Sequence, residues 1–144
     1  MIIASILKSK GGQVIAVRPD DPASLVCATL AEHRIGAVLV READGSLHGI
    51  VSERDIVRAL AGKGEACLTQ SAASLMTRDL ITVTPQTQVT EALALMTDRR
   101  IRHLPVLEYG KLAGMVSIGD LVKARIDEAV HEAETLKAYV VSSG

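Results

Sequence analysis

The 144-residue sequence predicts an α+β fold built from two β-α-β-β-α repeats related by a pseudo-twofold axis. The chain repeats itself at a nearly constant spacing, and each repeat alternates short β-rich runs with helical patterns. One such unit of about 55 residues buries too little apolar surface to be stable alone. We therefore expect the two copies to share a core.

The repeat is visible in two pairs of segments. Val14–Pro19 aligns with Leu80–Pro85 at an offset of 66 residues, from Pro19 to Pro85. The offset falls to 65 where Gly49–Val57 aligns with Gly114–Val122. The change lies between two apolar runs, where a hairpin loop tolerates one residue more or less.

In the first repeat, a strand at Val14–Val17 is stopped by Pro19, and Ile6–Gly12 before it is expected to be flexible. A helix follows, with Asp21 as N-cap, Pro22 in its first turn and Gly36 ending it.

The rest of the first repeat is predicted from turn and capping signals. Strands at Ala37–Val40 and Leu47–Val51 flank the hairpin signal Asp44-Gly45. A helix then opens at Ser52 and runs to about Ala61.

The second repeat follows the same plan. Its first strand aligns at Leu80–Val83, its hairpin strands at Leu104–Leu107 and Leu112–Val116, and its last helix runs from Ser117 to about Val141. The expected domains are residues 5–62, a connector at 63–74, residues 75–125, and a C-terminal helical extension at 126–144.

Composition excludes several classes of function. Sixteen basic and 17 acidic residues give a net charge of −1, and aromatic residues make up 1% of the chain, which argues against nucleic-acid binding. No apolar run approaches a membrane span of about 18 residues. Cys27 and Cys67 lack metal-ligand spacing, so no metal site is expected. A cytoplasmic location with no membrane contact is the expectation.

Each repeat ends in the pattern Gly-φ-Val-Ser-x-x-Asp-φ-Val, where φ is apolar. One interpretation is a capping box, in which Ser52 and Asp55, or Ser117 and Asp120, satisfy backbone N–H groups. The other is that this helix start faces a ligand, its N–H groups favouring phosphate and its carboxylate accepting from two ribose hydroxyls. The two interpretations are compatible.

Cations near these motifs distinguish the repeats. Arg102 and His103 lie where the chain enters a buried strand and could meet a phosphate. The first repeat has Gly36 and Ala37 at these places, but it carries Arg54 inside its Ser-x-x-Asp motif.

Together these motifs resemble the cystathionine β-synthase (CBS) domain family, which occurs as tandem pairs also called Bateman modules. The matching segments cover about residues 5 to 125 and are Gly49–Val57, Gly114–Val122, Leu75–Thr77, Ile35–Val40 and Ile101–Val106. The resemblance implies a stand-alone pair that dimerises and binds an adenine ligand (AMP, ADP, ATP, NADH or S-adenosylmethionine) in clefts between the repeats.

The resemblance also implies the site residues. Asp55 and Asp120 would hold ribose, with Ser52 and Ser117 near ribose or phosphate. The remaining expected ligand-binding residues come from the starts of the strands and from the second motif: Val14, Ile15, Ile35, Gly36, Ala37, Arg54, Thr77, Leu80, Ile81, Ile101, Arg102, His103 and Pro105. The preferred cleft combines Arg54 and Asp55 with Leu80, Ile81, Arg102 and His103.

No catalytic motif is present, so we expect no enzyme activity. The alternative to a nucleotide sensor is a ligand-free dimeric adaptor that acts on an unknown effector protein through its last helix. That helix has more apolar positions than a domain core needs: Leu121, Val122, Ile126, Val130, Leu136 and Val140. They indicate a dimer contact, a partner groove, or packing against the chain itself.

Overall fold

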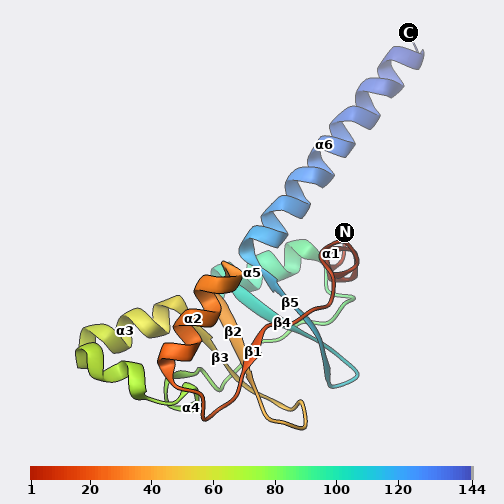
Figure 1. Cartoon of the computed structure of the whole chain (residues 1–144). Helices are drawn as coiled ribbons and strands as arrows, with labels where there is room; N and C mark the ends of the chain where they lie inside the picture. Colours follow the sequence, from red (N-terminus) through yellow and green to blue (C-terminus); the bar gives the residue numbers. More distant parts are fainter. Residues whose placement is uncertain (144) are drawn as a thin grey trace. The chain divides into compact units, whose positions relative to one another are not determined.

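The computed structural model describes residues 1–143, which divide into two compact units (Figure 1). Unit 2 is Gln13–Ile81, and unit 1 joins Met1–Gly12 to the chain from Thr82 onward. The N-terminal segment packs with the second repeat, and the expected connector at 63–74 belongs to the unit of the first.

Unit 2 is a three-stranded sheet with helices. Its strands lie in the order β1-β2-β3, with β1 parallel and β3 antiparallel to β2. The elements are β1 (Ala16–Val17), α2 (Ala23–His33), β2 (Ala37–Arg41), β3 (Leu47–Ser52), α3 (Glu53–Lys63), the 3₁₀ helix η1 (Gly64–Thr69) and α4 (Ala72–Leu75).

The core of unit 2 is aliphatic, as composition predicts. The central strand β2 is buried at each of its first four residues, Ala37–Val40, and Val26 and Leu30 of α2 pack in the same cluster. A central strand covered on both faces reads as a continuous apolar run, which is why Ala37–Val40 was predictable from sequence.

Unit 1 pairs an antiparallel hairpin with three helices. Its elements are α1 (Ile3–Lys10), α5 (Val89–Arg99), β4 (His103–Glu108), β5 (Lys111–Ser117) and α6 (Ile118–Ser143). Each of these five elements contributes a fully buried side chain to the protein's core: Ile3, Met96, Leu104, Val116 and Leu121.

Most of the segment expected to be flexible, Ile6–Lys10, belongs instead to helix α1. Ile3 N–H donates to the Thr87 carbonyl at 2.9 Å and Ala4 N–H to the Pro85 carbonyl at 2.8 Å. Ile3 is fully buried. These contacts with the second repeat, rather than local propensity, order the helix.

The first strands are shorter than predicted. Val14–Val17 shrinks to the two residues of β1, and the counterpart at Leu80–Val83 is reduced to a parallel bridge between Val83 and Val106. Pairing partners exist for only the last residues of each run. The plan β-α-β-β-α therefore holds fully in the first repeat and in reduced form in the second.

The predicted ends of α2 are also corrected. Pro22 is the N-cap, while the Asp21 carboxylate accepts from Arg18 N–H at 2.8 Å and so stabilises the preceding turn. The helix ends at Arg34 rather than Gly36, in a left-handed conformation with φ 54°. Arg100 ends α5 in the same way, also at φ 54°.

The expected connector is ordered. It forms the end of α3, η1 and α4, and its Cys67 and Ala72 are fully buried. Ala23 N–H donates to the Gln70 carbonyl at 2.8 Å, and Ala72 N–H donates to the Asp21 carbonyl at 2.7 Å. The connector thus pairs with the start of α2. In residues 1–143, we find no helix of the length and apolarity needed to cross a membrane.

Candidate functional site

Unit 2 gathers most of the first repeat's predicted residues at one end of its sheet. Ala37, at the start of β2, pairs with Ser52 at the end of β3, and Glu53 N–H donates to the Gly36 carbonyl at 2.9 Å. Because β1 runs parallel to β2 with Ala16 opposite Leu39, Val14 and Ile15 precede β1 at this same end. Strand starts and the first turn of α3 therefore meet here.

Ser52 and Asp55 form the predicted capping box at the start of α3. The Asp55 Oδ2 atom accepts from Ser52 N–H at 2.8 Å and from the Ser52 hydroxyl at 3.1 Å, and Ser52 Oγ accepts from Asp55 N–H at 3.3 Å. All of these carboxylate contacts use Oδ2. Among residues 1–143, no cationic side chain pairs with Asp55, and the neighbouring Arg54 is exposed.

Ser117 and Asp120 build the equivalent box at the start of α6, but here a cation is added. Asp120 Oδ2 accepts from Ser117 N–H at 2.8 Å, and Ser117 Oγ accepts from Asp120 N–H at 3.2 Å. The Lys10 ammonium donates to Asp120 Oδ2 at 2.7 Å and to the Met115 carbonyl at 3.0 Å. The second carboxylate is therefore already neutralised by its own chain.

The environment of Asp120 changes its acidity. Burial works to raise the pKa of Asp120, but the hydrogen bond and charge of Lys10, together with the hydrogen bonds from Ser117, outweigh it and hold the pKa below its usual range. Asp120 is thus kept ionised by a partner from its own chain.

Helix α1 carries Lys10 to this position. Its last turn ends at Gly11 with φ +93°, which returns the chain toward β5. Leu7 lies so close to Gly114 that a Cβ there would be 2.7 Å from Leu7 Cδ2. The absence of a side chain at Gly114 lets α1 rest against β5, with Lys10 reaching the first turn of α6.

The second repeat's basic segment lies at the matching end of the β4–β5 hairpin. His103 pairs with Ser117, and Ile118 N–H donates to the Arg102 carbonyl at 2.8 Å. Arg102 is exposed and His103 half-buried. Ile101 N–H bonds back to Met96, and Pro105 is buried with its carbonyl accepting from Val83, which gives Pro105 a structural role.

The remaining predicted residues lie at the end of unit 2. Thr77 is exposed and exchanges two backbone hydrogen bonds with Ile50, and Leu80 and Ile81 are half-buried. The preferred set takes Arg54, Asp55, Leu80 and Ile81 from unit 2, and Arg102 and His103 from unit 1. The joining of these six residues in one cleft stays a prediction.

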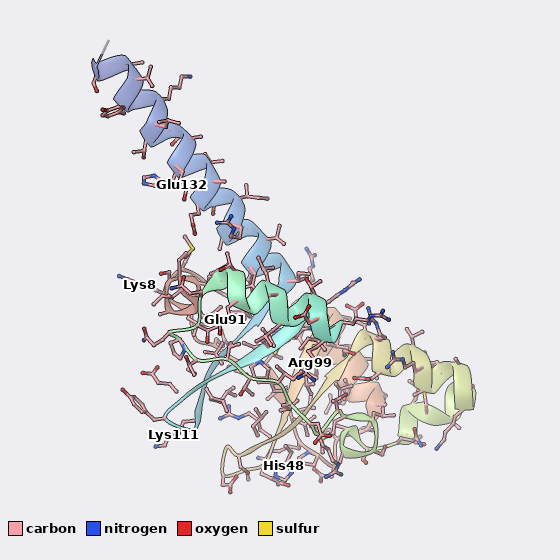
Figure 2. All side chains as sticks on the ribbon, turned by 180° about the vertical axis from the view of Figure 1, so that it is seen from behind. Lys8, His48, Glu91, Arg99, Lys111 and Glu132 are labelled. Atoms are coloured by element: carbon pink, nitrogen blue, oxygen red, sulfur yellow. The ribbon has the colours of Figure 1, made fainter. Side chains whose placement is uncertain are left out.

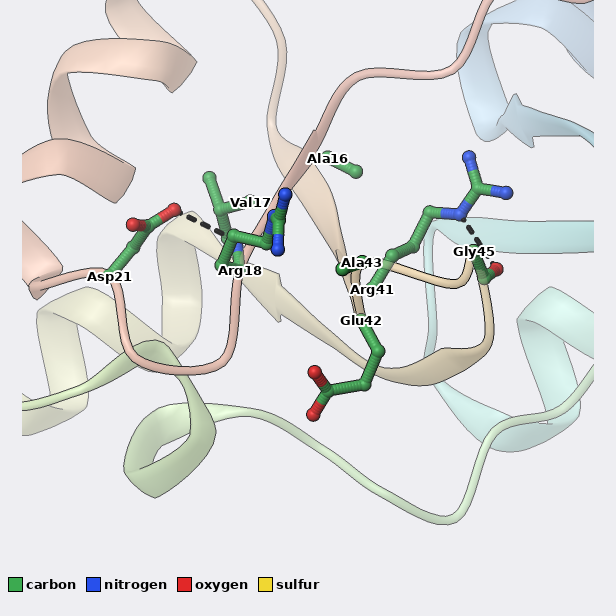
Figure 3. Close-up of a pocket in the computed structure, with 8 residues that line it drawn as sticks. All are labelled: Ala16, Val17, Arg18, Asp21, Arg41, Glu42, Ala43 and Gly45. Carbon is green, nitrogen blue, oxygen red and sulfur yellow. Dashed lines mark hydrogen bonds between the residues drawn. The ribbon is translucent and has the colours of Figure 1, made fainter.

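A hollow that sequence reasoning missed lies at the opposite end of the unit 2 strands (Figure 3). It encloses about 300 Å³ and is lined by Ala16, Val17, Arg18, Asp21, Arg41, Glu42, Ala43 and Gly45. Its polar groups largely serve local turns, since Asp21 accepts from Arg18 N–H and Arg41 Nε donates to the Gly45 carbonyl at 3.1 Å. None of the predicted ligand residues lines it.

Metal-ligating side chains do not cluster within residues 1–143: no group of three His, Cys, Asp or Glu residues could hold an ion there. The chemistry available at the Ser-x-x-Asp motifs is instead that of a helix N-terminus with an adjoining carboxylate. Such a place accepts hydroxyl hydrogen bonds and favours anions near the N–H groups.

The fold and these paired motifs define a tandem domain pair of the regulatory class. The chain belongs to the CBS domain family. The family model matches residues 6–62 and 72–127. CBS domain-containing protein CBSX3, mitochondrial, of Arabidopsis thaliana is 38% identical over 96% of this chain and 71% of its own length.

Solved structures agree with this assignment. The CBS-domain containing protein ATU1752 from Agrobacterium tumefaciens has a TM-score of 0.85 and 43% identity, covering 87% of this chain and 99% of its own. The CBS domain pair of protein MJ0100, solved with 5′-methylthioadenosine and S-adenosyl-L-methionine, shares the fold at a TM-score of 0.78 and 22% identity, covering 89% and 98% of the two chains.

Proposed function

We propose that this protein is a regulatory module that binds an adenine nucleotide in a cleft between its CBS repeats, with Asp55 as the anchor for the ribose. The observation that carries the proposal is the contrast between the two capping boxes. Both boxes use only the Oδ2 atom of the carboxylate, but Asp120 Oδ2 is also paired with Lys10 at 2.7 Å, whereas no cationic side chain in residues 1–143 pairs with Asp55. The negative charge of Asp55 is therefore available to a ligand, whereas that of Asp120 is offset by Lys10.

The chemistry of the surrounding residues fits a nucleoside with a phosphate. A carboxylate accepts two hydrogen bonds from the vicinal hydroxyls of ribose, each strengthened by the negative charge. The first turn of α3 favours phosphate, and in the predicted cleft Arg54, Arg102 and His103 would supply donors for it. Apolar residues at the strand starts, such as Val14 and Ile15, suit the face of adenine.

A solved relative gives further support. The MJ0100 pair was solved with two ligands that both contain adenosine. Its 22% identity leaves the ligand of the present chain open among AMP, ADP, ATP, NADH and S-adenosylmethionine.

Lys10 makes the two sites unequal. A ribose at Asp120 would meet a carboxylate whose charge is already offset by an ammonium that makes two hydrogen bonds, at 2.7 and 3.0 Å. The proposal therefore assigns one nucleotide per chain, at Asp55. Signalling would proceed through a homodimer. The nucleotide would shift the equilibrium between two conformations of that homodimer by binding one of them with higher affinity than the other.

The location and partners complete the proposal. A cytoplasmic location and an effector protein remain expectations from sequence, although the Arabidopsis relative is named as mitochondrial. The role is regulatory rather than catalytic.

A thermal-shift panel with Asp55→Asn tests the proposal. A ligand at one hundred times its Kd stabilises the native state by about 2.7 kcal/mol. We expect one of the five adenine compounds to raise the Tm of the wild type and of Asp120→Asn, but not of Asp55→Asn. The amide oxygen of asparagine can still accept from the Ser52 or Ser117 backbone N–H, so both variants should fold. An equal shift in Asp55→Asn, or no shift with any compound at millimolar concentration, would reject the proposal.

The second candidate is a ligand-free adaptor that acts through α6. The observation in its favour is the solvent exposure of apolar side chains on that helix, including Ile126 at 57% and Leu136 at 64%. An absence of any nucleotide effect in the panel would favour this alternative.

A further inference from the structure

Helix α6 is 26 residues long, and only its beginning packs into unit 1. Leu121 and Ala124 are buried at 0% and 8% exposure, and Glu128 is half-buried beside the N-terminal ammonium at 3.5 Å. From residue 129 to 142, each side chain is exposed. Figure 1 shows this second half of α6 extending beyond the other elements of unit 1.

The exposed part of α6 carries a heptad pattern. Apolar residues follow one another at alternating steps of four and three, and we call this set the α6 seam: Val122, Ile126, Ala129, Ala133, Leu136 and Val140. This alternation gives the period of 3.5 residues that marks a coiled coil. The seam spans about 27 Å at 1.5 Å per residue.

The α6 seam is distinct from the face that packs into unit 1. At about 100° per residue, the seam is centred roughly 120° around the helix from the buried side chains of Leu121 and Ala124. Of the six apolar positions noted in the sequence, Leu121 therefore belongs to the core, and Val130 lies beside the seam. Folding of unit 1 leaves the seam uncovered.

Charges beside the seam match those of a second copy. With Ile126 at position a of the heptad, Glu132 falls at g and Lys137 at the following e. In a parallel two-stranded coiled coil, g of one helix lies next to the following e of its partner, so the pair occurs twice across the interface. Figure 2 shows Glu132 on the exposed part of α6, far from the hairpin end marked by Lys111.

We propose that the α6 seam joins two copies of this chain as a parallel coiled coil. The occupant is a second copy because one sequence supplies both the apolar stripe and the opposite charges that flank it. Ala129 and Ala133 allow the two helices to approach closely at the centre, while Leu136 and Ile126 fill the layers on either side. The inference does not depend on nucleotide binding.

Two alanines give a matched test in the full chain. Ala133 lies in the seam and Ala138 on the opposite side of the helix, and both are exposed. Ala133→Glu places a charge in the seam, whereas Ala138→Glu adds the same charge to a solvent-facing position; glutamate suits a helix in both. We expect sedimentation equilibrium to show half the wild-type mass for Ala133→Glu and the wild-type mass for Ala138→Glu.

Charge reversal tests the parallel arrangement. Glu132→Lys or Lys137→Glu alone should weaken association severalfold by placing like charges together, and the double variant should restore it. A disulfide between two copies carrying Val140→Cys, in a Cys27→Ser background, is expected on oxidation because position a faces its equivalent only in parallel helices.

The inference would be overturned by a wild type that sediments as a 15.2 kDa monomer, or by equal masses for Ala133→Glu and Ala138→Glu. Failure of Val140→Cys to link two copies would overturn the parallel arrangement. The nucleotide-induced Tm shift of Ala133→Glu is measured as well. A shift equal to that of the wild type would show that nucleotide binding does not require association through the α6 seam, so the two proposals are tested independently.

Discussion

The contact between Lys10 and Asp120 joins residues 110 apart in the chain and predicts a measurable coupling between them. We would change Lys10→Met, which keeps the aliphatic stem, and Asp120→Asn, which keeps an oxygen that accepts from Ser117 N–H, and combine both in a double-mutant cycle. The cycle cancels the free-energy change caused by losing the separate hydrogen bond from Lys10 to the Met115 carbonyl. What remains is the free energy of the ion pair itself.

The expected size follows from exposure. The Lys10 side chain is 40% exposed and that of Asp120 25%, so solvent screens the pair despite its 2.7 Å separation. Pairs of this kind contribute about 0.2–1 kcal/mol to the free energy of unfolding. That corresponds to about 1–3 °C in Tm for a chain of this size.

The pH dependence has a definite sign. Because the pKa of Asp120 is lowered in the folded protein, the pair stabilises at neutral pH and its contribution is lost as the pH falls through that folded pKa. Urea denaturation of the four proteins, from neutral pH down to about pH 2, should show the coupling decline toward zero. A coupling that is absent at neutral pH and low salt, or unchanged in acid, would refute the ion pair.

Two further predictions concern the backbone of the repeats. Gly49→Ala should lower the free energy of unfolding by about 1–3 kcal/mol, and by more than Gly114→Ala does. The new Cβ at residue 49 would lie 2.7 Å from the Thr77 carbonyl oxygen, which is backbone and cannot easily move. The new Cβ at residue 114 would lie 2.7 Å from the end of the Leu7 side chain, which can move. Urea denaturation compares them, and equal losses would contradict the reasoning. Arg34→Gly and Arg100→Gly should each raise stability by about 0.5–1 kcal/mol by relieving left-handed backbone, since both have φ 54°; calorimetry that shows a loss would contradict this.

Sequence reasoning predicted the features that depend on local patterns. The duplication, the buried run Ala37–Val40 and the capping boxes at Ser52 and Ser117 are encoded within a few consecutive residues. Each of these follows from side-chain periodicity or from a fixed spacing of hydrogen-bonding groups. The CBS assignment, confirmed by the family model, rests on the same segments.

The features that were missed depend on distant contacts. Helix α1 is fixed by hydrogen bonds to Thr87 and Pro85, and Lys10 meets a carboxylate that no spacing in the sequence relates to it. The strand at Leu80–Val83 was overpredicted because β propensity alone does not supply a pairing partner. For the site, sequence located the motifs but gave no sign that Asp120 is paired and Asp55 is not.

The central claim is that the Asp55 carboxylate holds the hydroxyls of a ribose. Its most direct test is calorimetric titration of wild type and Asp55→Asn with the adenine nucleotide selected by the panel and with its 2′-deoxy form. We predict that the wild type loses about 10- to 100-fold in affinity on removal of the hydroxyl, as expected for a charge-assisted hydrogen bond, and that Asp55→Asn loses much less. Equal losses in both proteins would contradict the account.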